Sequence, residues 1–305
     1  MRLNRTQCQM PARCLVLVIL FCPVIALAAP KLTVGVSLLP QKFFVERIAG
    51  DRARVIVMVR PGQNEVTYEP KPSQLAQIEE AALYFLMAVP FEARWIKTFT
   101  QINPKLKLVP LPESIVLRPM RHDIESLAGD GDDSHHEQGD SHAAMLDPHV
   151  WLNPRLVKHI AESIKTAFIA IDPESQPVYE AGYRRFILEL DELDQYIREQ
   201  LAGVKNRRFM VYHPSWGYFA DEYALEQIPI EIEGKQPGAK TLSRLIEIAK
   251  QKQVKVIFVQ QQFSERDAKT IAGQVGAKIV KVDPLAGDYI ENLKRVSRQF
   301  AEVLR

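Results

Sequence analysis

Cysteine is scarce in this 305-residue chain, and all three cysteines lie within its first 22 residues: Cys8, Cys14 and Cys22. The remaining sequence therefore cannot form disulfides or thiolate metal sites. Any metal site there must use imidazole, carboxylate or backbone ligands. Long apolar runs are also absent beyond residue 28. We therefore expect no membrane-spanning helix there, because such a helix needs about 20 consecutive apolar residues.

The chain also lacks a strong charge of either sign. It has 39 Lys and Arg against 37 Asp and Glu, and three of the arginines lie before residue 14. Without these three, 36 basic residues face 37 acidic ones. A near-neutral chain without a basic stripe is not typical of nucleic-acid-binding proteins, so we expect no nucleic-acid partner.

The N-terminus has the layout of a secretory signal peptide. Three arginines precede an apolar run from Cys14 to Ala28, which is too short to span a bilayer and ends in small residues. We predict a signal peptide over residues 1–28, with Ala29 as the first mature residue. An uncleaved anchor is the alternative, and lipidation at Cys22 is disfavoured because the preceding Phe21 is bulky.

Strand and helix patterns alternate along the rest of the chain. Apolar strand-like runs occur at 31–38, 55–59, 83–87, 208–212, 256–259 and 278–282, with helical spacing between several of them. This alternation predicts an α/β fold with mostly parallel sheets that are covered by helices. About 277 residues suit two lobes.

One long helix is predicted between the two lobes, over residues 173–204. Its apolar positions step by three or four residues and are Phe186, Leu190, Leu193, Ile197 and Leu201. We therefore divide the mature chain into an N-terminal lobe (29–172), a connecting helix (173–204) and a C-terminal lobe (205–305).

Residues 121–146 interrupt the pattern of the first lobe. This stretch is rich in Asp, Gly and Ser, and it contains four of the seven histidines: His122, His135, His136 and His142. The composition predicts a surface loop. Such a loop can be a solvated linker or a place of weak, transient metal binding.

Two histidines stand in segments that can hold an imidazole ring in a fixed place. His149 lies between Pro148 and Val150-Trp151, and His213 directly follows the strand 208–212. Open α/β sheets bind ligands at the carboxyl ends of their strands, and histidine is the commonest metal ligand. Each has an ordinary alternative, a helix cap for His149 and a satisfied strand-edge histidine for His213.

Asp283 follows the strand 278–282 in the same manner. Its carboxylate is a candidate ligand, although Asp-Pro is also a common turn and Asp a common N-cap. Two imidazoles with carboxylates and no thiolate suit Zn²⁺ or Mn²⁺, and two histidines favour zinc.

Six motifs, in order, give the mature chain a resemblance to a known family. They are Tyr68-Glu69-Pro70-Lys71-Pro72-Ser73, Asp147-Pro148-His149-Val150-Trp151, Tyr212-His213-Pro214-Ser215, Glu233-Gly234-Lys235, Gln262-Phe263-Ser264 and Asp283-Pro284-Leu285. The chain resembles the periplasmic solute-binding proteins of zinc and manganese ABC importers (cluster A-I), and the histidine-rich stretch resembles the zinc-uptake type.

This resemblance implies a fold of two α/β lobes joined by one rigid helix. It also implies that a monomer in the periplasm binds Zn²⁺ in preference to Mn²⁺ and delivers the ion to a membrane permease with its ATPase. No reaction is implied.

The sequence departs from the family at one ligand. Val66 stands where members usually place their first metal-binding histidine, two residues before the Tyr-Glu-Pro motif. The predicted metal ligands are therefore His149, His213 and Asp283, with Glu65 as the fourth, or with water completing the shell.

Two other functional classes remain open from the sequence. A zinc hydrolase would also combine three ligands with a water, but the chain has neither a His-Glu-x-x-His motif nor a Gly-x-Ser-x-Gly turn. A surface adhesin or metal chaperone of the same fold is the second alternative, which the missing histidine keeps open.

Overall fold

The computed structural model describes residues 31–120, 146–231 and 235–305. The predicted signal peptide and nearly all of the predicted histidine-rich loop lie outside these residues. Within the described ranges, no helix has the length and apolar character needed to cross a membrane.

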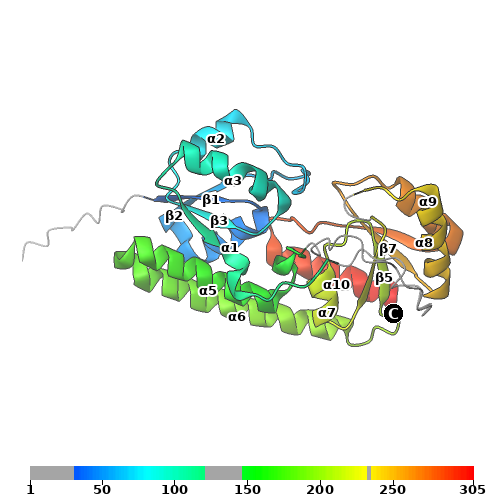
Figure 1. The fold of residues 1–305 in the computed structure, drawn as a ribbon. Helices are drawn as coiled ribbons and strands as arrows, with labels where there is room; N and C mark the ends of the chain where they lie inside the picture. The colour runs from blue at the N-terminus through cyan, green and yellow to red at the C-terminus, as the bar shows by residue number, and fades with distance from the viewer. Residues whose placement is uncertain (1–30, 121–145, 232–234) are drawn as a thin grey trace, which may run out of the picture. The chain divides into compact units, whose positions relative to one another are not determined.

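The first lobe is built on a four-stranded parallel sheet with the order β2-β1-β3-β4 (Figure 1). Its strands are β1 (Leu32–Val36), β2 (Ala53–Val57), β3 (Leu83–Leu86) and β4 (Lys107–Pro110). Its helices are α1 (Leu39–Ala49), α2 (Pro72–Ile78) and α3 (Pro90–Ile102). The central strands β1 and β3 are the most buried, as expected for a sheet covered on both faces.

The second lobe repeats this topology with the order β6-β5-β7-β8. Its strands are β5 (Arg208–Val211), β6 (Glu226–Pro229), β7 (Val256–Gln260) and β8 (Lys278–Val282). Its helices are α7 (Gly217–Glu222), α8 (Ala239–Gln251), α9 (Arg266–Val275) and α10 (Tyr289–Leu304). The predicted α/β class with two parallel sheets is confirmed.

Sequence patterns missed two strands, β4 and β6. Both are four residues long, stand at a sheet edge and end in proline. β4 has two apolar residues before its proline and β6 has one, so neither shows the longer apolar run by which the other strands were recognised, including β2 and β8 at the opposite edges.

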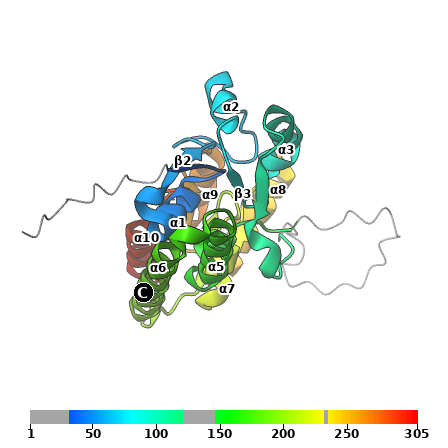
Figure 2. The ribbon, with the colours of Figure 1, turned by 90° about the vertical axis from the view of Figure 1, so that its left-hand side faces the viewer.

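The long connecting helix is α6, which spans 26 residues from Gln176 to Leu201. A 3-10 turn at Pro173–Ser175 precedes it, so the α-helix begins three residues later than predicted. All five predicted apolar positions are buried. They face α1 and α5 (Pro154–Ile171) of the first lobe and α10 of the second. Figures 1 and 2 both show α5 and α6 side by side.

The final helix also reaches the first lobe. At its start, the Tyr289 ring lies edge-on to Phe44 of α1, with 4.8 Å between centroids, and it also contacts Phe43. At its other end, Phe300 stacks on Phe258 of β7. One hydrophobic core therefore runs through both lobes, which favours small lobe motions over a wide hinge.

Gly182 allows α6 to pack closely against α1. A Cβ atom at this position would lie 2.2 Å from the carbonyl oxygen of Ile48 and 2.8 Å from that of Arg47. Backbone atoms cannot move aside as a flexible side chain can. We expect Gly182→Ala to lower the free energy of unfolding by about 1–3 kcal/mol, as overpacking does, in urea denaturation. Gly203→Ala is the control, since no atom lies within 4 Å of its Cβ; equal stability of both variants would contradict this interpretation.

Candidate metal centre

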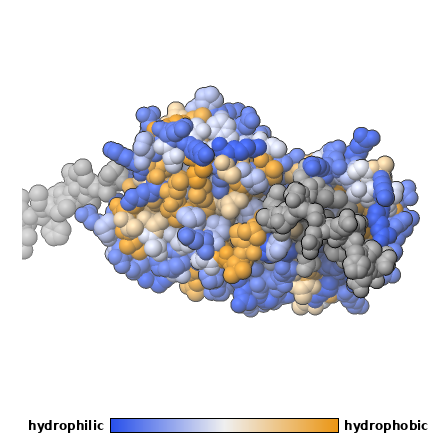
Figure 3. Space-filling view, in the orientation of Figure 1, coloured by the Kyte–Doolittle hydropathy of each residue, from blue (hydrophilic) through white to orange (hydrophobic). Residues whose placement is uncertain are grey.

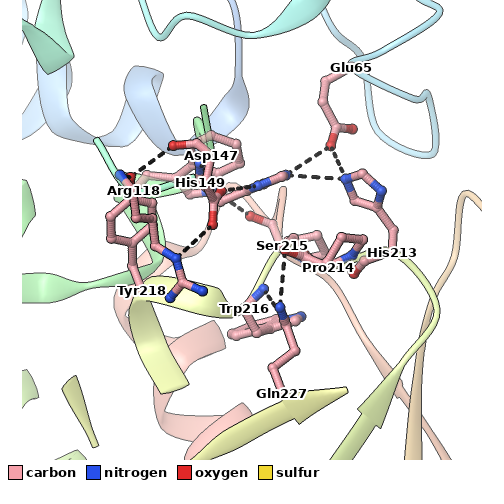
Figure 4. Close-up of polar contacts among 12 residues, drawn as sticks. Glu65, Arg118, Asp147, His149, His213, Pro214, Ser215, Trp216, Tyr218 and Gln227 are labelled. Carbon is pink, nitrogen blue, oxygen red and sulfur yellow. Dashed lines mark hydrogen bonds and ion pairs between the residues drawn. The ribbon is translucent and has the colours of Figure 1, made fainter. Parts of the chain in front are cut away.

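Three predicted ligand residues meet in one buried cluster, although they come from distant segments (Figure 4). Glu65 lies in the loop that follows β2, His149 directly precedes the 3-10 turn Val150–Leu152, and His213 follows β5. Their exposed fractions are 2%, 1% and 5%. Within the described ranges, no other group of three or more His, Cys, Asp or Glu has this geometry.

The ligand-type atoms of the cluster face a common point. The two Nε2 atoms of His149 and His213 are 3.3 Å apart, and Glu65 Oε1 lies 3.6 Å from the first and 3.8 Å from the second. Ligands at 2.0–2.1 Å from a tetrahedral zinc ion are separated by about 3.4 Å. The three atoms therefore have the spacing that three corners of a tetrahedral zinc site require.

The ring of His149 is held by an acidic neighbour. Its Nδ1 lies 2.7 Å from Asp147 Oδ1, which also accepts the His149 backbone N–H at 3.0 Å. The ring packs on Trp151, whose indole N–H donates to the carbonyl of Pro284 at 2.8 Å. This arrangement leaves Nε2 free to face the cluster.

His213 is held in the same way by the second lobe. Its Nδ1 lies 2.9 Å from Glu231 Oε1, and its ring stacks on Phe263 with an angle of 15° between the planes. The Gln260 side chain accepts the His213 backbone N–H and donates to its carbonyl. Each histidine thus has one nitrogen against a carboxylate and the other in the cluster. Such carboxylate partners fix ring orientation and make the free nitrogen a better metal ligand.

The two carboxylates that hold the imidazoles, Asp147 and Glu231, were not predicted from the sequence. Asp147 gave a usable signal, because it stands two residues before His149. Glu231 gave none, since it follows the unrecognised strand β6. The ladder pairs Val211 with Pro229, so two residues further on His213 and Glu231 stand side by side.

The charges of the cluster are strongly coupled. Burial disfavours the charged form of Glu65, but the hydrogen bond with His149 and the charges of both histidines outweigh it and lower the Glu65 pKa. Burial likewise opposes protonation of His149, but Asp147 and Glu65 outweigh it and raise the His149 pKa to about 9. At neutral pH His149 is therefore protonated on both ring nitrogens and lies between the carboxylates of Asp147 and Glu65. An incoming metal ion must displace one of these protons.

Asp283 does not join this group. Its Oδ1 accepts the backbone N–H of Leu285 at 2.9 Å, and its carbonyl accepts the Asn292 side chain at 2.7 Å. It follows β8, which is separated from β5 by β7. Two strand spacings of about 4.8 Å put the ends of β5 and β8 roughly 10 Å apart. The geometry fits the turn-forming alternative.

Val66 cannot supply a ligand, but its backbone helps to hold the Glu65 loop. Its N–H donates to Asn64 Oδ1 at 2.7 Å, and its carbonyl accepts Arg94 Nη2 at the same distance. These contacts fix the chain on the C-terminal side of Glu65, so that its carboxylate enters the cluster.

The chain matches a known protein family over most of its length. Residues 34–303 match the family of the periplasmic component A of zinc-uptake complexes, ZnuA. A crystal structure of ZnuA is 37% identical and superposes with a TM-score of 0.82, covering 90% of this chain and all of that one. The chain belongs to the ZnuA family.

Three further relatives are less similar to this chain than that ZnuA structure. The high-affinity zinc uptake system protein ZnuA of Bacillus subtilis is 28% identical over 84% of this chain and 79% of its own length. The zinc-binding protein AdcA of Streptococcus pyogenes is 27% identical over 92% of this chain, which spans only 55% of AdcA. The laminin-binding protein Lmb of Streptococcus agalactiae is 21% identical to this chain with a TM-score of 0.75, a likeness that shows a common fold and nothing more.

Proposed function

We propose that this protein captures Zn²⁺ reversibly and delivers it to the permease of an ABC importer, without catalysing a reaction. The observation that carries the proposal is the buried group of Glu65, His149 and His213, with both histidines held by carboxylates. The names of the ZnuA and AdcA relatives support zinc as the cargo. A zinc-bound ZnuA deletion mutant, 37% identical to this chain, supports it further.

Three protein ligands are proposed to bind the ion, with a water in the fourth position. This set has one imidazole fewer than the resemblance implies, because Val66 replaces it. A site that must release its cargo does not need four strong ligands. Asp283, which was predicted from the sequence as a ligand with Glu65 as the fourth, is an alternative to that water, although its carboxylate already accepts a backbone N–H.

The remaining parts of the proposal concern location and partners. Export through a cleavable signal peptide over residues 1–28 would place the protein in the periplasm, in agreement with the periplasmic description of the family. There we propose that it acts as a monomer and docks, when loaded, on the permease that works with the ATPase. The adhesin alternative has no support beyond a shared fold.

Titration calorimetry with Zn²⁺ and Mn²⁺ on the mature, metal-stripped protein tests the proposal. We expect one zinc ion to bind per chain, more tightly than manganese, because two of three ligands are imidazoles. Absence of zinc binding at micromolar concentration would refute zinc capture. Hydrolysis of generic esters or peptides by the loaded protein would instead favour a zinc enzyme.

The carboxylates behind the histidines are expected to matter for affinity. Asp147→Asn and Glu231→Gln keep the size of the side chain but remove the charge that orients each imidazole. We expect each to weaken zinc binding about 10- to 100-fold, measured by competition with a zinc chelator. Glu226→Gln is the control, since Glu226 pairs with Arg208 and Lys252 away from the cluster. Unchanged affinity in both test variants would exclude an orienting role.

A further inference from the structure

Arg118 lies behind the metal cluster and contacts both histidine-bearing segments. Its side chain is only 16% exposed, and its Nε is 3.7 Å from Asp147 Oδ2. The other oxygen of the same carboxylate, Oδ1, contacts His149 Nδ1 at 2.7 Å. One carboxylate therefore joins Arg118 to a proposed zinc ligand, as Figure 4 shows.

The backbone of Arg118 strengthens this connection. Its carbonyl accepts the N–H of Asp147 at 2.9 Å, and its N–H donates to the Tyr218 hydroxyl at 3.0 Å. The same hydroxyl donates to the carbonyl of Asp147 at 2.9 Å. Asp147 is thus held by three contacts, two with Arg118 and one with Tyr218 in the first turn of α7.

Helix α7 belongs to the segment of His213, because it begins four residues after that histidine. Arg118 Nη1 pairs with Asp221 of α7, and its guanidinium lies 5.6 Å from the Tyr218 ring centroid. Gly217 allows the close approach: a Cβ there would lie 2.8 Å from Asp147 Oδ2 and 3.0 Å from the Arg118 guanidinium. The His149 segment and α7 therefore meet on this one arginine.

We infer that Arg118 is a positioning residue for zinc capture: it ties Asp147 to α7, and through Asp147 it holds the His149 ring at its distance from His213. Arginine suits this task because its planar guanidinium holds its N–H donors in fixed directions toward two carboxylates, whereas a lysine ammonium is a point charge on a flexible stem. The inference rests on the proposed zinc capture and adds a residue outside the ligand shell.

A double-mutant cycle tests the inference. Zinc affinity is measured by chelator competition for wild type, Arg118→Gln, Asp147→Asn and the double variant, with thermal stability recorded in parallel. We expect Arg118→Gln alone to weaken zinc binding about tenfold. In the Asp147→Asn background it should cause less than a twofold further loss, because Arg118 acts through Asp147.

Arg155→Gln is the matched control. Arg155 also pairs with α7, through Glu222 at 3.2 Å, but its side chain is 60% exposed and its carboxylate partner is Glu222 instead of Asp147. We expect its zinc affinity to equal that of wild type. Arg118→Lys keeps the positive charge but loses the planar guanidinium, and should bind zinc about threefold more weakly than wild type. If Arg118→Gln does not fold, Arg118→Lys takes its place in the double-mutant cycle.

Two results would overturn the inference. One is wild-type zinc affinity in Arg118→Gln or, if the lysine variant is used, in Arg118→Lys. The other is an equal loss in the presence and absence of the Asp147 carboxylate, which would mean a general structural role. Failure of the wild type to bind zinc would instead refute the proposed function itself, so the two failures are distinguishable.

Discussion

Replacing His149 or His213 with alanine is expected to lower zinc affinity at least a hundredfold, a loss of about 2.7 kcal/mol or more. Each substitution removes one of three ligand atoms and also leaves a buried carboxylate, Asp147 or Glu231, without its imidazole partner. Both losses act in the same direction. Chelator competition at pH 7.5 measures the effect, and circular dichroism checks that the variants fold.

His159→Ala is the matched control for this experiment. His159 is an exposed histidine on α5 and belongs to no ligand group among the described residues. Its replacement should leave zinc affinity unchanged. Wild-type affinity in both test variants would remove His149 and His213 from the site and refute the proposed ligand set.

The two carboxylate candidates can be separated by the same assay. Glu65→Gln is expected to weaken zinc binding because Glu65 Oε1 faces both imidazoles, whereas Asp283→Asn should not. A large loss in Asp283→Asn alone would mean that the turn at Asp283 rearranges when the ion binds.

Zinc affinity is expected to rise about a hundredfold between pH 6.5 and pH 8.5. Asp147 and Glu65 raise the pKa of His149 to about 9 against the opposing effect of burial, so below pH 9 the metal-free cluster holds a proton. Zinc needs neutral imidazole and must displace that proton. One displaced proton makes the apparent affinity rise about tenfold per pH unit until the pKa is reached.

Calorimetry in buffers of different ionisation enthalpy checks this directly. At pH 7.5 we expect about one proton to be released from His149 for each zinc ion bound. Asp147→Asn replaces the carboxylate whose hydrogen bond contributes most to raising the pKa of His149, so its affinity should depend less on pH above neutrality. An affinity independent of pH from 6.5 to 8.5 in the wild type would show that His149 carries no proton to displace.

The class of the fold was readable from local patterns, because buried strands and amphipathic helices leave period-dependent runs of apolar residues. The five buried positions of α6 were predicted individually. β4 and β6 have too few apolar residues for this pattern, so they became visible only through their ladders with β3 and β5.

Part of the metal cluster was likewise predicted from the sequence, and part was not. His149 and His213 were predicted from the sequence alone, because His149 lies in a segment fixed by proline and His213 directly follows a strand. Glu65 was predicted as a replacement ligand, because its neighbour Val66 stands where the family usually has a metal-binding histidine. The partners Asp147 and Glu231 were not identified, although the second is adjacent to His213 once β6 is placed beside β5.

The sequence by itself determined the α/β class, the two lobes with their connecting helix, and two imidazoles suited to zinc, because these features depend on residue type and local spacing. Only the tertiary structure decided which carboxylates face those imidazoles. That choice depends on packing between distant segments: strand order brings Glu231 beside His213 and keeps Asp283 two strands away, and Arg118 joins the His149 segment to α7. Strand order is set by packing between segments far apart in the chain, and no local pattern records it.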